Sequence, residues 1–258
     1  MDPSMAVGIA AGIGLIMYGI GFGNLDAFAS FQSAVIVIGG TFAALVASFP
    51  SRMLSKVPQQ VVIAVKGHLP EPGLFIEQIA YFAEVARRYG LLALEEHAVV
   101  QEDEFMRDSL LLIVDAVDSD KARAMLEADL VYLDDRHKEA NSFFERGAAF
   151  SPAFGMIGTL IGLILMLANL QLDAVDGTTV LTHGMAIALI TTFYGSLLAN
   201  LFFIPVSSKL QAKHEREMLC KQIIIEGILS IQAGENPKFI RDKLISFLPY
   251  KERLNLKK

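Results

Sequence analysis

Three threonines draw attention because each places a hydroxyl inside a long apolar stretch. Thr159 lies in SPAFGMIGTLIGLILMLANL (151–170), and Thr191 and Thr192 lie in GMAIALITTFYGSLLANLFFIPV (184–206). Hydroxyl oxygens are hard ligands that suit a small cation. Successive helical residues point ~100° apart, so one of the adjacent pair can face a neighbouring helix while the other lines a path. A threonine hydroxyl can equally bond the carbonyl one turn earlier, so local satisfaction is the alternative reading.

Ionisable side chains are missing from these same stretches. Residues 147–172 and 177–208 contain no Asp, Glu, Lys or Arg, and His183 lies at the edge of the second stretch. A chain of this kind cannot relay protons through a membrane by itself. The sequence also has no phosphate-binding loop, no His/Cys cluster at metal-ligand spacing and no nucleophile with a matching base. We therefore predict that the protein is not an enzyme.

Small residues and prolines follow a pattern in the apolar stretches. Glycines stand four residues apart at 8 and 12, at 19 and 23, and at 158 and 162. This spacing lets helix backbones approach closely, so packing within one chain explains it. Pro152 and Pro205 lie near the ends of their stretches, where a proline is tolerated in a helix. A hinge at each proline is the alternative.

The elements that position these residues are predicted to be membrane-spanning helices. The chain has 258 residues, of which 53% are hydrophobic and only 19% are charged, so it is too apolar for an ordinary soluble domain. Stretches of about 20 apolar residues can cross a bilayer as helices. We predict an all-α integral membrane protein with four spans, near residues 5–23, 31–49, 148–170 and 184–206.

The positive charges fix the predicted topology. Eleven of the 22 Lys and Arg lie between Arg52 and Arg146, and the other eleven lie between Lys209 and Lys258. Basic residues stay on the cytoplasmic side, so both polar segments and both termini are predicted to be inside. The single Cys220 falls in a cytoplasmic segment, so we expect no disulfide. A net charge of −6 with intermixed signs argues against nucleic-acid binding.

The predicted domains follow from this map. Residues 1–50 and 148–206 form two transmembrane hairpins, 51–147 form a helical cytoplasmic domain, and 207–258 form cytoplasmic C-terminal helices. Gly90 and Gly234 are predicted to end helices, and Asn236 to cap one that has Pro237 in its first turn. After a break at Asp118, Ser119 or Asp120 is predicted to cap a helix that runs directly into the third span.

Several of these segments, taken in order, resemble the A subunit of the flagellar motor stator, the MotA/PomA family. The resemblance rests on SPAFGMIGTLIGLILMLANL, on GMAIALITTFYGSLLANLFFIPVSSKL, on ARRYGLLALEE (86–96) and on DDRH (134–137). It covers nearly the whole chain. It implies an ion channel in the bacterial inner membrane, a homo-pentamer around a dimer of a MotB/PomB-type B subunit. That subunit would supply the membrane aspartate that this chain lacks.

The resemblance also implies roles for individual residues. The family's prolines, linked to coupling ion flow to cytoplasmic movement, fall on Pro152 and Pro205. The threonine that faces the partner's aspartate falls on Thr192, and a threonine typical of sodium-using members falls on Thr159, with Thr191 beside them. Transported Na⁺, held transiently by Thr159 and Thr192, is therefore favoured, H⁺ stays open, and no other cofactor is implied.

The cytoplasmic charges carry over in the same way. The positions at which such subunits engage the rotor protein FliG fall on Arg87 or Arg88 and on Glu95 with Glu96. Exposed charges of this kind are more often simply solvated. If they do contact the rotor, their weakness suits contacts that form and break at each step.

One feature, the outer loop, departs from the family's usual pattern, and an alternative function has to be weighed against the stator. The outer loop QLDAVDGTTVLTHG (171–184) is longer than the short proline-containing turn typical of sodium-type relatives. It brings His183 near the ion entrance, where we expect it to be merely interfacial; a pH-sensing role is the alternative. An ExbB/TolQ-type energiser of outer-membrane processes is the alternative function. That group usually has three spans, so the predicted two hairpins favour the stator.

Overall fold

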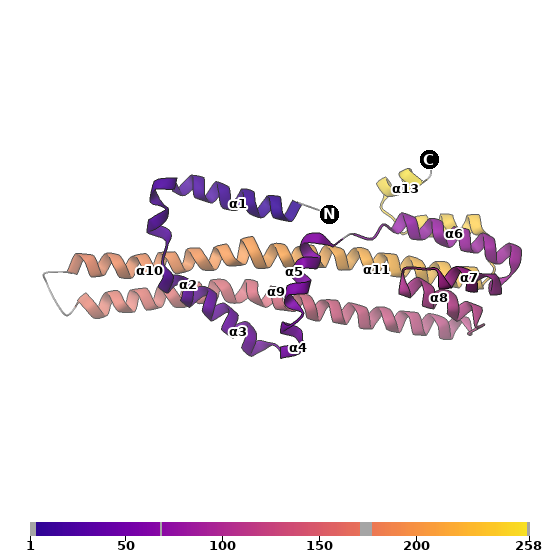
Figure 1. The fold of residues 1–258 in the computed structure, drawn as a ribbon, viewed down its shortest axis with the longest axis horizontal. Coiled ribbons are helices and arrows are strands. Elements are labelled where there is room, and N and C mark those ends of the chain that lie inside the picture. Colours follow the sequence, from indigo (N-terminus) through magenta and orange to yellow (C-terminus); the bar gives the residue numbers. More distant parts are fainter. Residues whose placement is uncertain (1–3, 68, 171–176, 257–258) are drawn as a thin grey trace. The chain divides into compact units, whose positions relative to one another are not determined.

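The computed structural model is all-helical, as the sequence predicts, and it describes residues 4–67, 69–170 and 177–256. Two compact units divide the chain (Figure 1). Unit 1 comprises Met1–His68 and Lys138–Gln211, and unit 2 comprises Leu69–His137 and Ala212–Lys258. Two long helices, α9 (Ser119–Leu170) and α11 (Ile204–Gln232), contribute residues to both units.

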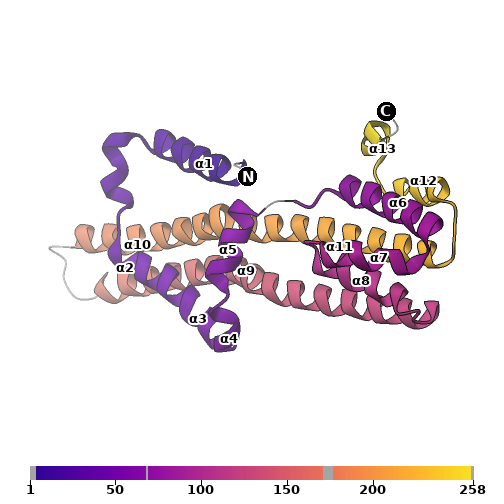
Figure 2. The same cartoon turned by 45° about the vertical axis from the view of Figure 1, so that its right-hand side comes forward.

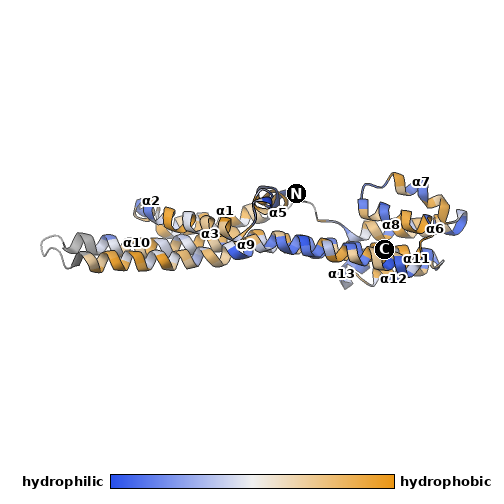
Figure 3. Cartoon of the chain, turned by 90° about the horizontal axis from the view of Figure 1, so that it is seen from below, coloured by the Kyte–Doolittle hydropathy of each residue, from blue (hydrophilic) through white to orange (hydrophobic). Residues whose placement is uncertain are grey.

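Unit 1 contains the apolar stretches. Its elements before α9 are α1 (Ser4–Ile20), the 3₁₀ helix η1 (Phe22–Phe28), α2 (Phe31–Ala34), the π-helical turn η2 (Val35–Gly39), α3 (Gly40–Ser48), α4 (Ser51–Leu54) and α5 (Val57–Lys66). α10 (Gly177–Leu198) and the π-helical turn η4 (Ala199–Phe203) lead into α11. Figures 1 and 2 show α10 beside the second half of α9, and Figure 3 shows hydrophobic residues along both.

Three helical segments of the described residues are long and apolar enough to cross a membrane. They lie within Phe31–Ser48, Ser119–Ala168 and Thr182–Gln232, and a fourth is reached if α1 and η1 are counted as one bent span. The predicted span at 184–206 falls within the last of these segments, and those at 31–49 and 148–170 extend one and two residues beyond the first and second. The first predicted span is different, because α1 ends at Ile20 and the chain bends by 98° into η1. Gly21 permits the bend with a φ of 82°.

The predicted continuity of the long helices is confirmed. α9 runs unbroken through the segment predicted to be cytoplasmic into the third predicted span, and α11 continues from the fourth. The N-terminal cap of α9 differs from the prediction. The Asp118 carboxylate, rather than Ser119 or Asp120, accepts from the amides of residues 120 and 121, at 3.2 and 3.4 Å. An aspartate just before the helix can reach these otherwise unpaired amides.

Unit 2 consists of short helices packed against parts of α9 and α11. These are α6 (Pro72–Tyr89), the 3₁₀ turn η3 (Leu91–Ala93), α7 (Leu94–Val99), α8 (Glu104–Val114), α12 (Pro237–Ile245) and α13 (Tyr250–Leu256). The predicted helix ends are confirmed, since Gly90 and Gly234 have φ of 85° and 72° and the Asn236 side chain accepts from the amide of Lys238.

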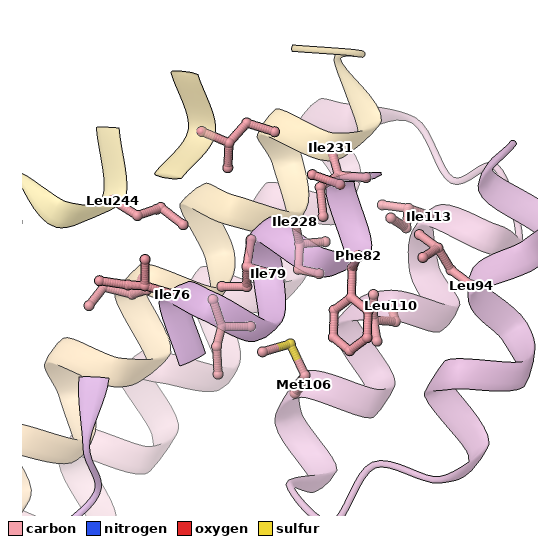
Figure 4. Packing of buried hydrophobic residues seen from close by; sticks show 14 of the residues in the cluster. Ile76, Ile79, Phe82, Leu94, Met106, Leu110, Ile113, Ile228, Ile231 and Leu244 are labelled. Atoms are coloured by element: carbon pink, nitrogen blue, oxygen red, sulfur yellow. The ribbon is translucent and has the colours of Figure 1, made fainter. Parts of the chain in front are cut away.

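The core of unit 2 explains why these short helices are stable. Phe82 of α6 packs with Met106 and Leu110 of α8, and Ile79 faces Ile228 of α11 (Figure 4). Each of these side chains is buried. Helices this short are marginal alone, so their stability comes from the apolar face that each one buries.

Candidate functional site

Glycines bring α9 and α10 into close contact in unit 1. A Cβ added to Gly158 would lie 2.4 Å from the Cβ of Thr191, and one added to Gly162 would lie 2.5 Å from the carbonyl oxygen of Gly184. At Gly195 it would lie 2.6 Å from the carbonyl oxygen of Ser151. The two backbones therefore approach along a line of glycines, which we call the α9–α10 seam.

The other glycine pairs behave differently. Nothing lies within 4 Å of the Cβ position at Gly8, Gly19 or Gly23, and Gly12 meets only a Leu201 methyl at 3.1 Å. Within this chain, the close helix approach predicted from glycine spacing is found at 158 and 162 but not along α1.

The three threonines occupy different places around the seam. Thr191 is fully buried against Gly158, and its hydroxyl donates to the carbonyls of Ile187 (2.9 Å) and Ala188 (3.0 Å). Thr192 is exposed in the single chain and donates to the carbonyl of Ala188 at 3.2 Å. Thr191 thus faces the neighbouring helix, and Thr192 faces outward.

Thr159 lies at the edge of the same seam. It is partly exposed, and its hydroxyl donates to the carbonyl of Met156 at 2.6 Å. Gly155, one turn earlier on the same face of α9, would place a Cβ 3.3 Å from the Cα of Thr192. Thr159 therefore lies about one helical turn along α9 from the residue that meets Thr192.

A hydroxyl that donates to a carbonyl of its own helix can still bind a cation through its oxygen. A hydroxyl donates one proton and keeps two acceptor lone pairs. At Thr159 and Thr192 the proton is used by the helix itself, so the lone pairs are what each oxygen can offer to a cation. Across the described residues, no group of three or more His, Cys, Asp or Glu could hold a metal ion.

The two prolines lie inside continuous helices. Pro152 is exposed in the middle of α9, and the neighbouring Ser151 hydroxyl donates to the carbonyl of Gly147 at 2.7 Å. Pro205 is the second residue of α11, and the π-helical turn η4 ends two residues before it, at Phe203. A proline ring clashes with the carbonyl four residues earlier, and a widened turn relieves that clash. Both positions therefore lack a backbone hydrogen bond without ending the helix.

Arg87, Arg88, Glu95 and Glu96 gather where α6 meets α7 in unit 2, which we call the α6–α7 corner. The arginines lie in the last turn of α6 and the glutamates in the first turn of α7. All four are exposed, and none forms an ion pair with another residue of the described chain. The same segment also carries exposed apolar side chains, namely Tyr89 (74%), Leu92 (73%), Val99 (74%) and Val100 (72%).

Helix dipoles account for part of this charge pattern, because cations favour a helix C-terminus and anions an N-terminus. They do not account for the exposed apolar residues beside the charges. Unpaired charges among exposed apolar side chains form a surface that can contact another protein.

A histidine pair in unit 2 was not predicted. The Nδ1 atoms of His137 and His214 lie 3.1 Å apart, and Nε2 of His214 lies 2.9 Å from the Asp134 carboxylate. The sequence motif DDRH holds two of the three residues, but the third lies 77 positions away, so only the fold pairs them. Burial lowers the pKa of His137, and His214 and Arg136 lower it further, against the carboxylates of Glu217 and Asp134.

The remaining predicted residues are placed as follows. His183 is exposed on α10. Residues 171–176, the first part of the long outer loop, lie outside the described chain, and the rest of that loop belongs to α10. Tyr194, also in the fourth predicted span, contacts the carbonyl of Phe28 and accepts from the amide of Ser30 at 3.3 Å.

Replacement of Gly158 by alanine should destabilise unit 1, because the new Cβ lies 2.4 Å from Thr191 Cβ. Overpacking of this kind costs about 1–3 kcal/mol. Thermal unfolding of the purified chain in detergent measures the effect. Gly14→Ala is the matched control, since nothing lies within 4 Å there. Equal unfolding temperatures for the two variants would contradict the seam.

Acid should weaken the fold near His137. Burial holds its pKa in the folded chain below the ordinary histidine value of 6.5, so the unfolded chain binds more protons as pH falls. We expect the unfolding temperature to fall as pH drops below 6.5. The free energy of unfolding should fall by less than the ~1.4 kcal/mol per pH unit that one full proton gives. His137→Gln should flatten this slope, whereas His183→Gln should not. A slope unchanged by His137→Gln would refute the prediction.

Comparison with known proteins shows that the chain is similar to motility proteins of an ion-channel family. Residues 97–222 match the MotA/TolQ/ExbB proton channel family. The chain is 37% identical to Motility protein A of Treponema pallidum, over 99% of this chain and 97% of the relative. It is 33% identical to Chemotaxis protein PomA of Vibrio alginolyticus, over 96% of each.

A solved structure shares the fold. The flagellar MotAB stator complex from Bacillus subtilis contains a chain that is 28% identical with a TM-score of 0.87, over 100% of this chain and 99% of that one.

Proposed function

The chain belongs to the MotA/TolQ/ExbB proton channel family, and from that premise we propose that it works as the A subunit of a flagellar stator, which turns ion flow into torque. It is a multi-pass membrane protein of a channel family and not an enzyme. The observation that carries the proposal is full-length similarity to the stator chain, with a TM-score of 0.87.

The partner follows from what the spans lack. None of the predicted spans contains an Asp or Glu, so the site that takes up an ion must come from a second chain. A B subunit supplies a membrane aspartate, and five copies of the present chain surround two B subunits. Both termini and residues 51–147 and 207–258 lie in the cytoplasm, and residues 1–50 and 148–206 form the membrane hairpins.

The ion path runs along the α9–α10 seam. A cation enters from outside and binds the partner's carboxylate, with Thr159 and Thr192 replacing part of its water shell. Their lone pairs remain available because each hydroxyl proton is already used by a carbonyl of its own helix. Oxygen ligands of this type fit Na⁺, so sodium is the favoured ion and H⁺ the alternative.

Torque is transmitted through the α6–α7 corner. Neutralising the partner's carboxylate removes its need for polar surroundings, and the ring of A subunits steps around the partner, with the helices at Pro152 and Pro205 yielding. Arg87, Arg88, Glu95 and Glu96 then push the rotor protein FliG. One charge moving through 100 mV yields ~2.3 kcal/mol, and an exposed ion pair is worth only ~0–1 kcal/mol, so such contacts can break at each step.

The alternative, an ExbB/TolQ-type energiser of outer-membrane processes, belongs to the same family. The full-length similarity to Motility protein A and PomA favours the stator.

Motility of a stator-less host tests the proposal. Expression of this chain with a B subunit should restore swimming, and expression of either alone should not. Replacing the B subunit's membrane aspartate by asparagine should abolish the rescue. Rescue of an outer-membrane import defect in place of motility would favour the energiser instead.

Thr159→Ala should raise the sodium concentration needed for half-maximal swimming speed, at constant membrane voltage. Loss of one oxygen ligand is expected to cost roughly 1.4 kcal/mol, or about tenfold in sodium. Thr159→Ser keeps the hydroxyl and should stay close to the unchanged protein. Speeds that do not respond to sodium in any of the three would rule out the sodium assignment.

Charge reversal at the α6–α7 corner should reduce stall torque. Arg87→Glu combined with Glu95→Lys should lower it more than either change alone, and charge reversal on FliG should restore part of the loss. Lys121→Glu, at an exposed position elsewhere in unit 2, is the control. Full torque in the double variant would move the rotor contact away from this corner.

A further inference from the structure

Helix α5 in unit 1 has two apolar faces, although a helix on a protein surface normally has one. Val57, Val61, Ala64 and Val65 pack into the core of unit 1. On the other side, Val62 and Ile63 are 53% and 43% exposed. Gln59 and Lys66 flank them at helical spacing, so this outward face is an apolar pair between polar residues.

The charge of the surrounding segment has one sign. No Asp or Glu occurs between Asp26 and Glu71, whereas Arg52, Lys56 and Lys66 all do. These three side chains are exposed, and none pairs with an acidic residue of the described chain. Unpaired cations in one short segment require counter-ions from outside the protein.

Packing against unit 1 fixes the position of α5 relative to the ends of the predicted membrane spans. The first of the three candidate membrane-spanning segments, Phe31–Ser48, ends just before α4, which begins at Ser51. The core that receives α5 includes Phe143, Phe144 and Ala148 of α9, where the third predicted span begins. Arg146 lies over the ring of Phe49, 5.5 Å from its centroid. The helix is therefore held at the level where the spans meet water.

We propose that the outward face of α5 docks on the bilayer surface, with Val62 and Ile63 inserted among acyl chains and Arg52, Lys56 and Lys66 bound to anionic phospholipid headgroups. This docking rests on the cytoplasmic orientation given under the proposed function and concerns a different surface from the ion path. Interfacial helices combine an apolar insert with basic side chains in this way. Lysine and arginine stems can also lie along the apolar surface while their charges reach the headgroups.

A protein partner fits this face less well. A stable interface buries about 800 Å² on each side, far more than two aliphatic side chains offer. A negatively charged lipid surface needs no matching shape, and each basic residue near it contributes about fivefold to binding.

Fluorescence quenching by lipid tests the docking directly. A bimane placed through Gln59→Cys leaves every proposed contact residue in place. The native Cys220 is buried, and burial raises its pKa to about 11, so it stays largely unlabelled. The full chain, in complex with its B subunit, is placed in nanodiscs of phosphatidylcholine and phosphatidylglycerol. A nitroxide is carried in turn by one lipid or the other, near the headgroup.

Quenching by nitroxide phosphatidylglycerol should exceed quenching by nitroxide phosphatidylcholine at least fivefold. Arg52→Gln with Lys56→Gln and Lys66→Gln should remove this preference. Lys121→Gln with Lys238→Gln and Lys251→Gln removes the same charge from exposed sites in unit 2 and should preserve it. Val62→Asn with Ile63→Asn should weaken quenching by both lipids.

Two results would overturn the proposal. Equal quenching by the two lipids would rule out recognition of anionic headgroups. No quenching by either would mean that protein, including a second copy of the chain, covers this face. Because the signal reports lipid contact and not ion flow or swimming, its failure is distinct from failure of the stator function.

Discussion

The close approach of α9 and α10 is the constraint on which unit 1 depends. Gly162 and Gly195 leave room for the opposite backbone and Gly158 leaves room for the Thr191 side chain, so a Cβ at any of them would clash. In a bilayer no water can satisfy a polar group, and the hydroxyls of Thr159, Thr191 and Thr192 each donate to a carbonyl of their own helix. The seam thereby fixes which threonine is buried and which two can face another chain.

In the proposed complex, this arrangement means that the two kinds of chain contribute different groups to the ion site. This chain contributes oxygen atoms and a rigid, closely packed pair of helices, while the titrating carboxylate belongs to the partner. An ionisable residue placed in these spans would need its own buried counter-charge, at a cost of several kcal/mol. α9 and α11 carry residues of both units, so they are the covalent link between the seam and the α6–α7 corner.

Local features of this fold could be predicted from sequence, and long-range ones could not. Apolar length located three spans, and Gly90, Gly234 and Asn236 marked helix ends because their chemistry acts within a turn. The bend at Gly21 was missed, since a glycine in an apolar run also fits a straight helix. The pairing of His137 with His214 joins positions 77 apart, and the contrast between Gly158 and Gly8 depends on which helix lies opposite. The roles of Thr159, Thr192 and the α6–α7 corner come from the resemblance and stay predictions.

The central claim is that the carboxylate that takes up the ion belongs to the B subunit, and cation flux into liposomes tests this claim most directly. The purified chain would be reconstituted alone and, separately, together with a B subunit, and flux would be recorded under an imposed voltage. The account predicts no sustained, selective flux from this chain alone, and flux that depends on the partner's membrane carboxylate when both are present. Sustained selective current from the chain alone would contradict it.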